Sequence, residues 1–294
     1  MNSPFTPNIE NTTNTSMSTA KLRTHIRSLR RSLTPQQQAE HAHQALTHLI
    51  SYLEHQSTPP QKIALFLSQD GELDTQPVID YLWQNTDHAL YLPVLERPNT
   101  TNTAGAPNAV GQPSTKMCFM CYTPESVMVK NHFNILEPVT PTVMEAAREQ
   151  VVKPTLKSTL ASVKGETMKP DSEKNSALNN KACVFQGPVE GCDLDMVLMP
   201  LVAFDLQGNR MGMGGGYYDR AFAFKLQADS QTKSQTKSQS TQPPNSLPQS
   251  PAPKTVPQLI GWAHSCQAVN QLNSEVWDVP LDSLITEKGL IEFK

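Results

Sequence analysis

The chain has 294 residues, and its 24 basic and 27 acidic side chains give a formal charge of −3. A chain of this length can bury a sizeable core, and its slightly acidic balance excludes a whole-protein attraction to nucleic acid or to an anionic membrane. No stretch approaches the roughly 20 apolar residues of a membrane span, and the first 20 residues lack a signal-peptide pattern. We therefore expect a cytoplasmic protein that binds neither nucleic acid nor membranes.

Helical spacing and capping signals predict three helices in the first third of the chain. The apolar residues of the first helix are Leu22, Ile26, Leu29 and Leu33. Residues 34–37 (TPQQ) supply a cap, a proline at the first position and a capping-box glutamine for a second helix that runs towards Leu53. A third helix is expected to begin near Thr75, with Val78, Ile79, Leu82 and Trp83 facing inward.

Short apolar runs predict strands that alternate with these helices. The runs cover residues 62–67, 88–95, 117–122, 194–204, 258–264 and 282–286. Unbroken apolar strands between helices indicate an α/β fold with an open, mainly parallel sheet and helices on both faces, a three-layer α/β/α arrangement. Ligands of such sheets gather at the carboxyl ends of the strands.

Polar stretches interrupt this alternation in three places, near residues 97–116, 139–191 and 227–257. Their low hydrophobicity cannot offset the entropy of ordering, so we interpret them as disordered surface insertions. Residues 1–18 are expected to form a disordered tail, and residues 19–294 a single domain.

The cysteines offer one pattern that could indicate zinc or redox chemistry, the C-x-x-C formed by Cys118 and Cys121. This segment is predicted to be a strand, where an offset of three sends two side chains to opposite faces. No second C-x-x-C completes a zinc site, so we interpret both cysteines as structural. Five cysteines are an odd number in a long chain, and we expect reduced thiols.

The most unusual segment is "NRMGMGGGYYDR", residues 209–220, which has four glycines in five positions between a predicted strand and a predicted helix. Glycines there let backbone N–H groups converge on an anion, and a phosphate cradle is one explanation. A sharp turn is the other. Arg210 and Arg220 flank the glycines and can contact phosphate. Asp219 is either a magnesium ligand or a helix-cap aspartate.

Three further groups of charged residues each have two explanations. Arg23, Arg27 and Arg30 share one face of the first helix, which is either solvated or packed against the glycine loop, where it would add positive charge. In "SQDGELDT", residues 68–75, the acidic side chains are turn residues or accept hydrogen bonds from a ligand. Asp278 becomes meaningful only beside Asp219, as a second magnesium ligand.

Six blocks in chain order resemble the 5-formyltetrahydrofolate cyclo-ligase family, also called 5,10-methenyltetrahydrofolate synthetases. They are residues 66–83, 91–95, 135–138, 201–220, 261–267 and 276–286. The resemblance implies an ATP- and Mg²⁺-dependent ligase that converts 5-formyltetrahydrofolate to 5,10-methenyltetrahydrofolate and releases ADP and phosphate. It also implies phosphorylation of the formyl oxygen followed by attack of N10. With only small-molecule partners implied, we expect a monomer.

The same resemblance implies roles for individual residues. ATP would be bound by Lys21, Arg23, Arg210, Met211, Gly212, Met213, Gly214, Gly215, Gly216, Tyr217 and Tyr218. The folate would contact Leu67, Glu72, Met213, Gly214, Gly215, Gly216 and Tyr217. Asp219 and Asp278 would bind magnesium, and Arg210 and Tyr217 would be catalytic.

Two positions depart from the family pattern. The family's usual lysine falls at Thr19, so that either Lys21 replaces it or the contact is missing. Met213 stands where many relatives have a basic residue. A non-catalytic folate- or nucleotide-binding protein is the main alternative. The presence of Glu72, Asp219 and Asp278 beside an intact loop favours catalysis. A nucleic-acid module built on the basic helix is disfavoured by the acidic chain.

Overall fold

The structure is a computed structural model that describes residues 17–95, 116–131, 133–139, 188–226 and 256–293. Most of the predicted tail and most of the three predicted insertions therefore lie outside the described residues. No helix within the described ranges is both long enough and apolar enough to cross a membrane.

A seven-stranded sheet forms the centre of the molecule, in the order β11-β10-β9-β6-β1-β2-β3. Its strands are β1 (Lys62–Ala64), β2 (Ala89–Leu95), β3 (Met117–Cys121), β6 (Met196–Met199), β9 (Gln258–Trp262), β10 (Ser283–Thr286) and β11 (Gly289–Glu292). The five central strands are parallel, and the edge strands β3 and β11 are antiparallel to their neighbours. The prediction of an open, mainly parallel α/β sheet is confirmed.

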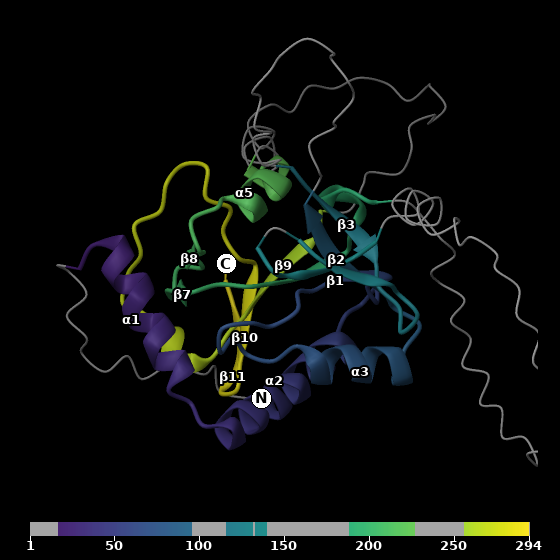
Figure 1. The fold of residues 1–294 in the computed structure, drawn as a ribbon, viewed down its shortest axis with the longest axis horizontal. Helices are drawn as coiled ribbons and strands as arrows, with labels where there is room; N and C mark the ends of the chain where they lie inside the picture. The colour runs from purple at the N-terminus through teal and green to yellow at the C-terminus, as the bar shows by residue number, and fades with distance from the viewer. Residues whose placement is uncertain (1–16, 96–115, 132, 140–187, 227–255, 294) are drawn as a thin grey trace, which may run out of the picture.

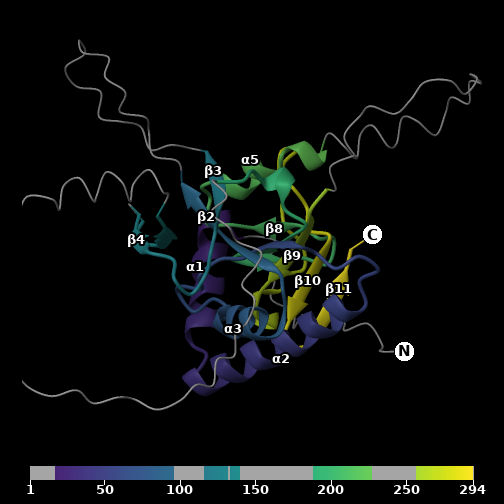
Figure 2. The ribbon, with the colours of Figure 1, turned by 90° about the vertical axis from the view of Figure 1, so that its right-hand side faces the viewer.

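Helices cover the two faces of this sheet. The long helices α2 (Pro35–Glu54) and α3 (Gln76–Asn85) lie on one side, and the short α5 (Tyr217–Phe222) lies on the other (Figures 1 and 2). Leu49 and Leu82 bury their side chains in the first core with Ile260, while Phe222 packs with Phe119 in the second. The apolar side chains on the two faces of the sheet are therefore buried in two separate cores.

Helix α1 (Thr19–Arg31) occupies a third position, at the carboxyl ends of β6 and β9. Its buried Leu22 and Ile26 pack against Val202 and Val269, which follow those strands. Leu29 shares the helical spacing of Leu22 and Ile26 but is exposed, and the neighbouring Arg30 is buried instead. A buried arginine requires partners, and the acidic turn after β1 provides them.

The second helix begins as predicted. Thr34 Oγ1 accepts a hydrogen bond from the Gln37 N–H at 3.2 Å, and Gln37 Oε1 accepts one from the Thr34 N–H at 2.9 Å. This reciprocal capping box satisfies two backbone donors that the first helical turn leaves free. It fixes the point at which the chain turns from α1 into α2.

Two predicted strands are shorter in the structure. The run 62–67 forms a strand only as far as Ala64. The run 194–204 splits at Pro200, because proline has no N–H for the ladder: β6 ends at Met199, and β7 (Ala203–Phe204) pairs with β8 (Arg210–Met211) in a separate hairpin. The residues between Phe204 and Arg210 form the loop of this hairpin. Strand β11 was not predicted, and neither was the small sheet of β4 (Met128–Lys130) and β5 (Leu136–Pro138).

The cysteine predictions are partly confirmed. Cys118 packs with Val94 and Met120, whereas Cys121 packs against the core that contains Phe119, so the two side chains face opposite sides of β3 as expected. Cys118, Cys192 and Cys266 are free, but Cys121 is disulfide-bonded, and the prediction of reduced thiols is wrong there. An odd number of cysteines excludes complete pairing but not a single disulfide.

Candidate functional site

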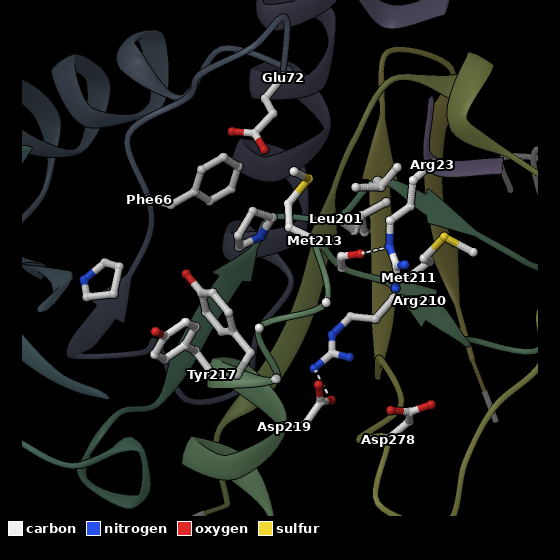
Figure 3. A pocket seen from close by; sticks show the side chains of 18 of the residues that line it. Arg23, Phe66, Glu72, Leu201, Arg210, Met211, Met213, Tyr217, Asp219 and Asp278 are labelled. Carbon is white, nitrogen blue, oxygen red and sulfur yellow. Dashed lines mark hydrogen bonds and ion pairs between the residues drawn. The ribbon is translucent and has the colours of Figure 1, made fainter. Parts of the chain in front are cut away.

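A cavity of about 1610 Å³ opens at the carboxyl ends of the parallel strands. Phe66 and Leu67 reach it after β1 and Leu201 after β6. The long loop before β10 lines the cavity with residues 270–273, Glu275, Trp277 and Asp278. The glycine-rich segment lines it as well (Figure 3). This is the edge at which an α/β sheet is expected to bind ligands.

The glycines of the loop answer different structural needs. Gly214 has φ +96° and Gly216 has φ +63°, backbone conformations that residues with a side chain rarely adopt. At Gly215, an added Cβ would lie 2.8 Å from the Tyr217 ring. A Cβ at Gly212 would meet nothing within 4 Å. The turn explanation therefore accounts for three of the glycines, whereas Gly212 presents its backbone to open space in the cavity.

Arginine side chains hold this loop from two sides. Arg23 Nε donates a hydrogen bond to the Gly212 carbonyl at 2.9 Å, and Arg220 Nη2 donates one to the Gly215 carbonyl at 2.8 Å. The Arg220 guanidinium also lies over the Tyr217 ring, 5.1 Å from its centre. Helix α1 thus packs against the loop, and of the two explanations for its basic face, the solvated surface is wrong for Arg23.

The other arginines of α1 converge on one carboxylate. Asp70 accepts hydrogen bonds from Arg27 Nε at 2.7 Å and Arg30 Nη2 at 2.9 Å, and it also pairs with Arg31. Burial alone would raise the pKa of Asp70, but these arginines lower it to about 2. The cluster fixes the turn after β1 against α1, and so places Glu72 beside the cavity.

Two carboxylates lie together at one end of the cavity, below Arg210 (Figure 3). Asp219 Oδ1 accepts hydrogen bonds from Arg210 Nη2 at 2.7 Å and from the Val279 N–H at 3.2 Å. Asp278 Oδ2 accepts one from the Glu275 N–H at 2.8 Å. The N-cap of α5 is Gly216, so Asp219 is not its cap residue. Carboxylate oxygens of this kind are ligands that Mg²⁺ prefers.

Glu72, with a side chain that is 16% exposed, lies at the opposite end of the cavity, and the phenol of Tyr218 also lines the cavity (Figure 3). Glu72 lies 3.5 Å from Arg30 Nη1 and accepts a hydrogen bond from the Gln69 N–H at 3.0 Å. Burial raises the pKa of Glu72, and Arg30 opposes this effect. Burial also raises the pKa of Tyr218, and the negative charge of Glu72 adds to the shift. Tyr218 therefore keeps its proton and can donate it in a hydrogen bond.

Asp74, another acid of this turn, forms hydrogen bonds within the turn itself. Its Oδ1 accepts hydrogen bonds from Ser68 Oγ at 2.7 Å and from the Gln76 N–H at 3.1 Å. Of the two explanations offered for the acids of residues 68–75, the turn role fits Asp74, and the ligand role stays open for Glu72.

Comparison with known proteins decides the family. The model of the 5-formyltetrahydrofolate cyclo-ligase family matches residues 15–162 and 154–256. The 5-formyltetrahydrofolate cyclo-ligase of Escherichia coli (strain K12) is 32% identical over 272 residues, which cover 91% of this chain and 100% of that protein. The chain belongs to the 5-formyltetrahydrofolate cyclo-ligase family.

Two other cyclo-ligase relatives extend this comparison. The 5-formyltetrahydrofolate cyclo-ligase of Haemophilus influenzae is 29% identical over 267 residues, covering 90% of this chain and 95% of that one. The NMR structure of Aquifex aeolicus 5,10-methenyltetrahydrofolate synthetase superposes with a TM-score of 0.54 at 21% identity, over 95% of this chain and 94% of that one. The superposition on the Aquifex aeolicus structure shows that the two proteins share a fold.

Within this cyclo-ligase, the predicted site residues gather around one cavity with a single exception. Arg23, Leu67, Glu72, all nine residues from Arg210 to Tyr218, Asp219 and Asp278 line it. Lys21 is exposed and does not line it, whereas Thr19 does. Met213 is 59% exposed, so its side chain stands at the open side of the cavity. The roles of these residues stay predictions.

Aromatic side chains that the sequence analysis did not single out also line the cavity. They are Phe66, Phe133 and Trp277. The ring of Phe133 lies edge-on to Tyr217 with centroids 6.2 Å apart, and Trp277 is 62% exposed. Trp277 could have been found as a large apolar residue in a polar loop. Phe66 lies within a predicted apolar strand, so nothing in the sequence marked it as a cavity residue.

Proposed function

We propose that this protein converts 5-formyltetrahydrofolate to 5,10-methenyltetrahydrofolate with ATP and Mg²⁺ as co-substrate and cofactor, and releases ADP and phosphate. The observation that carries the proposal is the meeting of a glycine loop, arginines and two carboxylates in one cavity of a cyclo-ligase family member. The described residues are organised around one seven-stranded sheet, which supports a single catalytic domain.

The reaction needs three bond changes at the formyl group. The formyl oxygen accepts the γ-phosphoryl group of ATP, N10 of the folate attacks the activated carbon, and the carbon–oxygen bond then breaks. The N10 proton is released and phosphate departs, which leaves the cyclic methenyl cation. Such chemistry depends chiefly on positioning and on neutralising negative charge. Arg210 and Tyr217 are the proposed catalytic residues, since both lie in the loop between the two ends of the cavity.

The loop suits a triphosphate. Gly212 leaves open space where a side chain would stand, and Arg23, Arg210 and Arg220 supply positive charge around it. Residues 210–218 would hold the phosphates through backbone N–H groups, which approach closely because Cβ atoms are missing. Arg23 would act together with them by fixing the loop.

The metal end suits Mg²⁺. Asp219 and Asp278 offer carboxylate oxygens at the same side of the cavity, and a hard cation selects such donors (Figure 3). When bound, Mg²⁺ would neutralise phosphate charge. Arg210, which already pairs with Asp219, would share that carboxylate with the cation and keep it oriented towards the loop.

The remaining end suits the folate. Glu72 can accept hydrogen bonds from ring N–H donors, and Leu67 and Tyr217 provide apolar surface for a flat ring, as Phe66 and Phe133 do. Met213 projects from the loop towards this end (Figure 3). The cavity therefore has room for both ligands with the loop between them.

The test follows the absorbance of the methenyl product in a mixture of purified protein, 5-formyltetrahydrofolate, ATP and Mg²⁺. We expect a gain that disappears when either ATP or Mg²⁺ is omitted. Binding of folate and ATP without any gain, under conditions where a known cyclo-ligase turns over, would instead establish the non-catalytic binding protein. Size-exclusion chromatography of the same sample tests the expected monomer.

A further inference from the structure

A second group of polar side chains lies outside the cavity and comes from three distant parts of the chain. His41 belongs to α2, His264 follows β9, and Glu287 lies in the turn between β10 and β11. One ligand-type atom from each residue lies within 4.8 Å of the other two. His41 Nδ1 is 3.0 Å from His264 Nδ1 and 4.0 Å from Glu287 Oε2. None of the three lines the cavity.

This group is buried, which makes its polarity costly. His264 is fully buried, Glu287 is 5% exposed, and the His41 side chain is 18% exposed. A carboxylate and two imidazoles in such a place need partners that compensate for lost water. The Ser265 N–H donates to Glu287 Oε2 at 2.9 Å, and Ser265 Oγ hydrogen-bonds to the other carboxylate oxygen. Two hydrogen bonds from one residue hold the carboxylate in a fixed orientation.

The geometry of the group suits a metal ion. The two imidazoles face each other through their Nδ1 atoms, and the Glu287 carboxylate lies beside them. Two imidazoles and a carboxylate form a donor set that Zn²⁺ takes in proteins. Two nitrogens bound tetrahedrally at about 2.0–2.1 Å lie roughly 3.3–3.4 Å apart, so the observed pair needs only a small adjustment.

Other charged groups near the cluster do not oppose a cation strongly. Arg30 is the nearby positive charge that also lowers the pKa of His264, but it is paired with Asp70 at 2.9 Å and with Glu72 at 3.5 Å. Burial raises the pKa of the Cys266 thiol to about 11, and the charge of Glu287 adds to this. Cys266 is not among the residues whose ligand atoms lie within 4.8 Å of one another, so it is not part of the proposed donor set.

We propose that His41, His264 and Glu287 bind one divalent transition-metal ion of the zinc type. The site would join α2 to the segments that follow β9 and β10, in addition to the apolar packing of α2 on the sheet and the hydrogen bond from Tyr52 to Gln258. The partly exposed His41 gives the ion a route from solvent and leaves a position for water. Its oxygen and nitrogen donors differ from the all-oxygen set proposed for Mg²⁺, so the two metals would occupy separate sites.

Calorimetric titration of the tag-free, chelator-treated full chain with Zn²⁺ tests this proposal. We expect one saturable site per chain and a rise in Tm with Zn²⁺, both unaffected by excess Mg²⁺. His41→Ala and Glu287→Gln should each weaken zinc binding at least tenfold. His43→Ala, an exposed histidine on the same helix, is the matched control and should bind zinc like the unmodified chain.

Two results would overturn the proposal. One is the absence of saturable zinc binding by the unmodified chain, which would leave the two histidines as a hydrogen-bonded pair. The other is tight zinc binding that persists in both variants, especially if thiol alkylation then abolishes it. Circular dichroism in the absence of metal checks that each variant is folded, and the titration of the unmodified chain decides the matter even where a variant is not.

Discussion

Arg210 donates a hydrogen bond of 2.7 Å to Asp219, and the two residues stand at opposite ends of the glycine loop. The same Asp219 oxygen accepts a hydrogen bond from the Val279 N–H at 3.2 Å, which links the loop to the segment before β10. The Arg210 side chain is only 5% exposed, so this carboxylate compensates a nearly buried charge. Asp219 therefore has a structural task beside its proposed role in metal binding.

Asp219→Asn separates these two tasks. Asparagine keeps the shape and one acceptor oxygen but removes the negative charge, so Arg210 keeps a weaker hydrogen bond. The proposed magnesium site loses a charged ligand, and changes at the residues around a metal typically cost about 10–100-fold in metal affinity or activity, so we expect turnover to fall by this factor. The Mg²⁺ concentration for half-maximal rate should rise. Steady-state kinetics at varied Mg²⁺ measure both effects.

Asp80→Asn is the control for this change, because Asp80 is an acid of α3 whose carboxylate bonds to Gln76 and does not line the cavity. It should leave the kinetics unchanged. If Asp219→Asn also left Mg²⁺ dependence and turnover unchanged in a folded protein, Asp219 would be a structural partner of Arg210 alone.

The positions of Arg23 and Lys21 predict different effects on ATP binding. Arg23 Nε donates to the Gly212 carbonyl at 2.9 Å, whereas Lys21 is exposed and away from the cavity. Removing one such hydrogen bond costs about 1–1.5 kcal/mol, so Arg23→Ala should raise the KM for ATP about five- to tenfold. Lys21→Ala should change it less than twofold. The reverse order in ATP-dependence measurements would show that Lys21 replaces the family lysine after all.

Much of the fold could be predicted because single residues mark its boundaries. Thr34 and Gln37 specified the start of α2, and apolar runs located the parallel strands. Pro200 was the missed signal, since a proline inside an apparent strand ends the ladder. The order of the strands could not be predicted, because it depends on which segments meet in space and not on local patterns.

The candidate site was predicted in its parts but not in its connections. The glycine loop and the carboxylates were identified by residue type and by resemblance. The convergence of three arginines of α1 on Asp70 was not predicted, because nothing in the sequence distinguishes Asp70 from an ordinary turn residue. The exposure of Leu29 could not be predicted either, because a helical period cannot tell that Arg30 is buried against an acid 40 residues away.

Asp70 predicts an acid-sensitive part of the stability. Its pKa is about 2 when folded and 3.8 ordinarily, so its contribution is fully present above pH 3.8 and is lost as the pH falls towards 2. Its side chain is 23% exposed, and solvent screening limits the effect to at most about 2 kcal/mol. Asp70→Asn, which tolerates the left-handed backbone at this position, should remove it.

Urea unfolding followed by circular dichroism at several pH values measures this effect. The difference in unfolding free energy between the unmodified chain and Asp70→Asn should be largest above pH 4 and shrink towards pH 2, where about half of the folded molecules carry a protonated Asp70. Asp87→Asn, at an exposed position, should show no such trend. A difference that stays constant across this range would mean that the arginines do not depend on the charge of Asp70.

The two kinds of glycine in the loop give the sharpest test of what the loop is for. Gly214 has φ +96°, so Gly214→Ala should destabilise the fold by about 1–2 kcal/mol, the strain of a left-handed residue. Gly212 has no such constraint, and a Cβ there meets nothing within 4 Å, so Gly212→Ala should leave Tm unchanged.

If phosphate oxygens occupy that open space, the added methyl group excludes them, and Gly212→Ala should raise the KM for ATP at least tenfold. Thermal unfolding and ATP-dependence measured on both variants separate the two requirements. An unchanged KM for Gly212→Ala would show that the ligand approaches the loop elsewhere, and that the open space beside Gly212 is not where the phosphates bind.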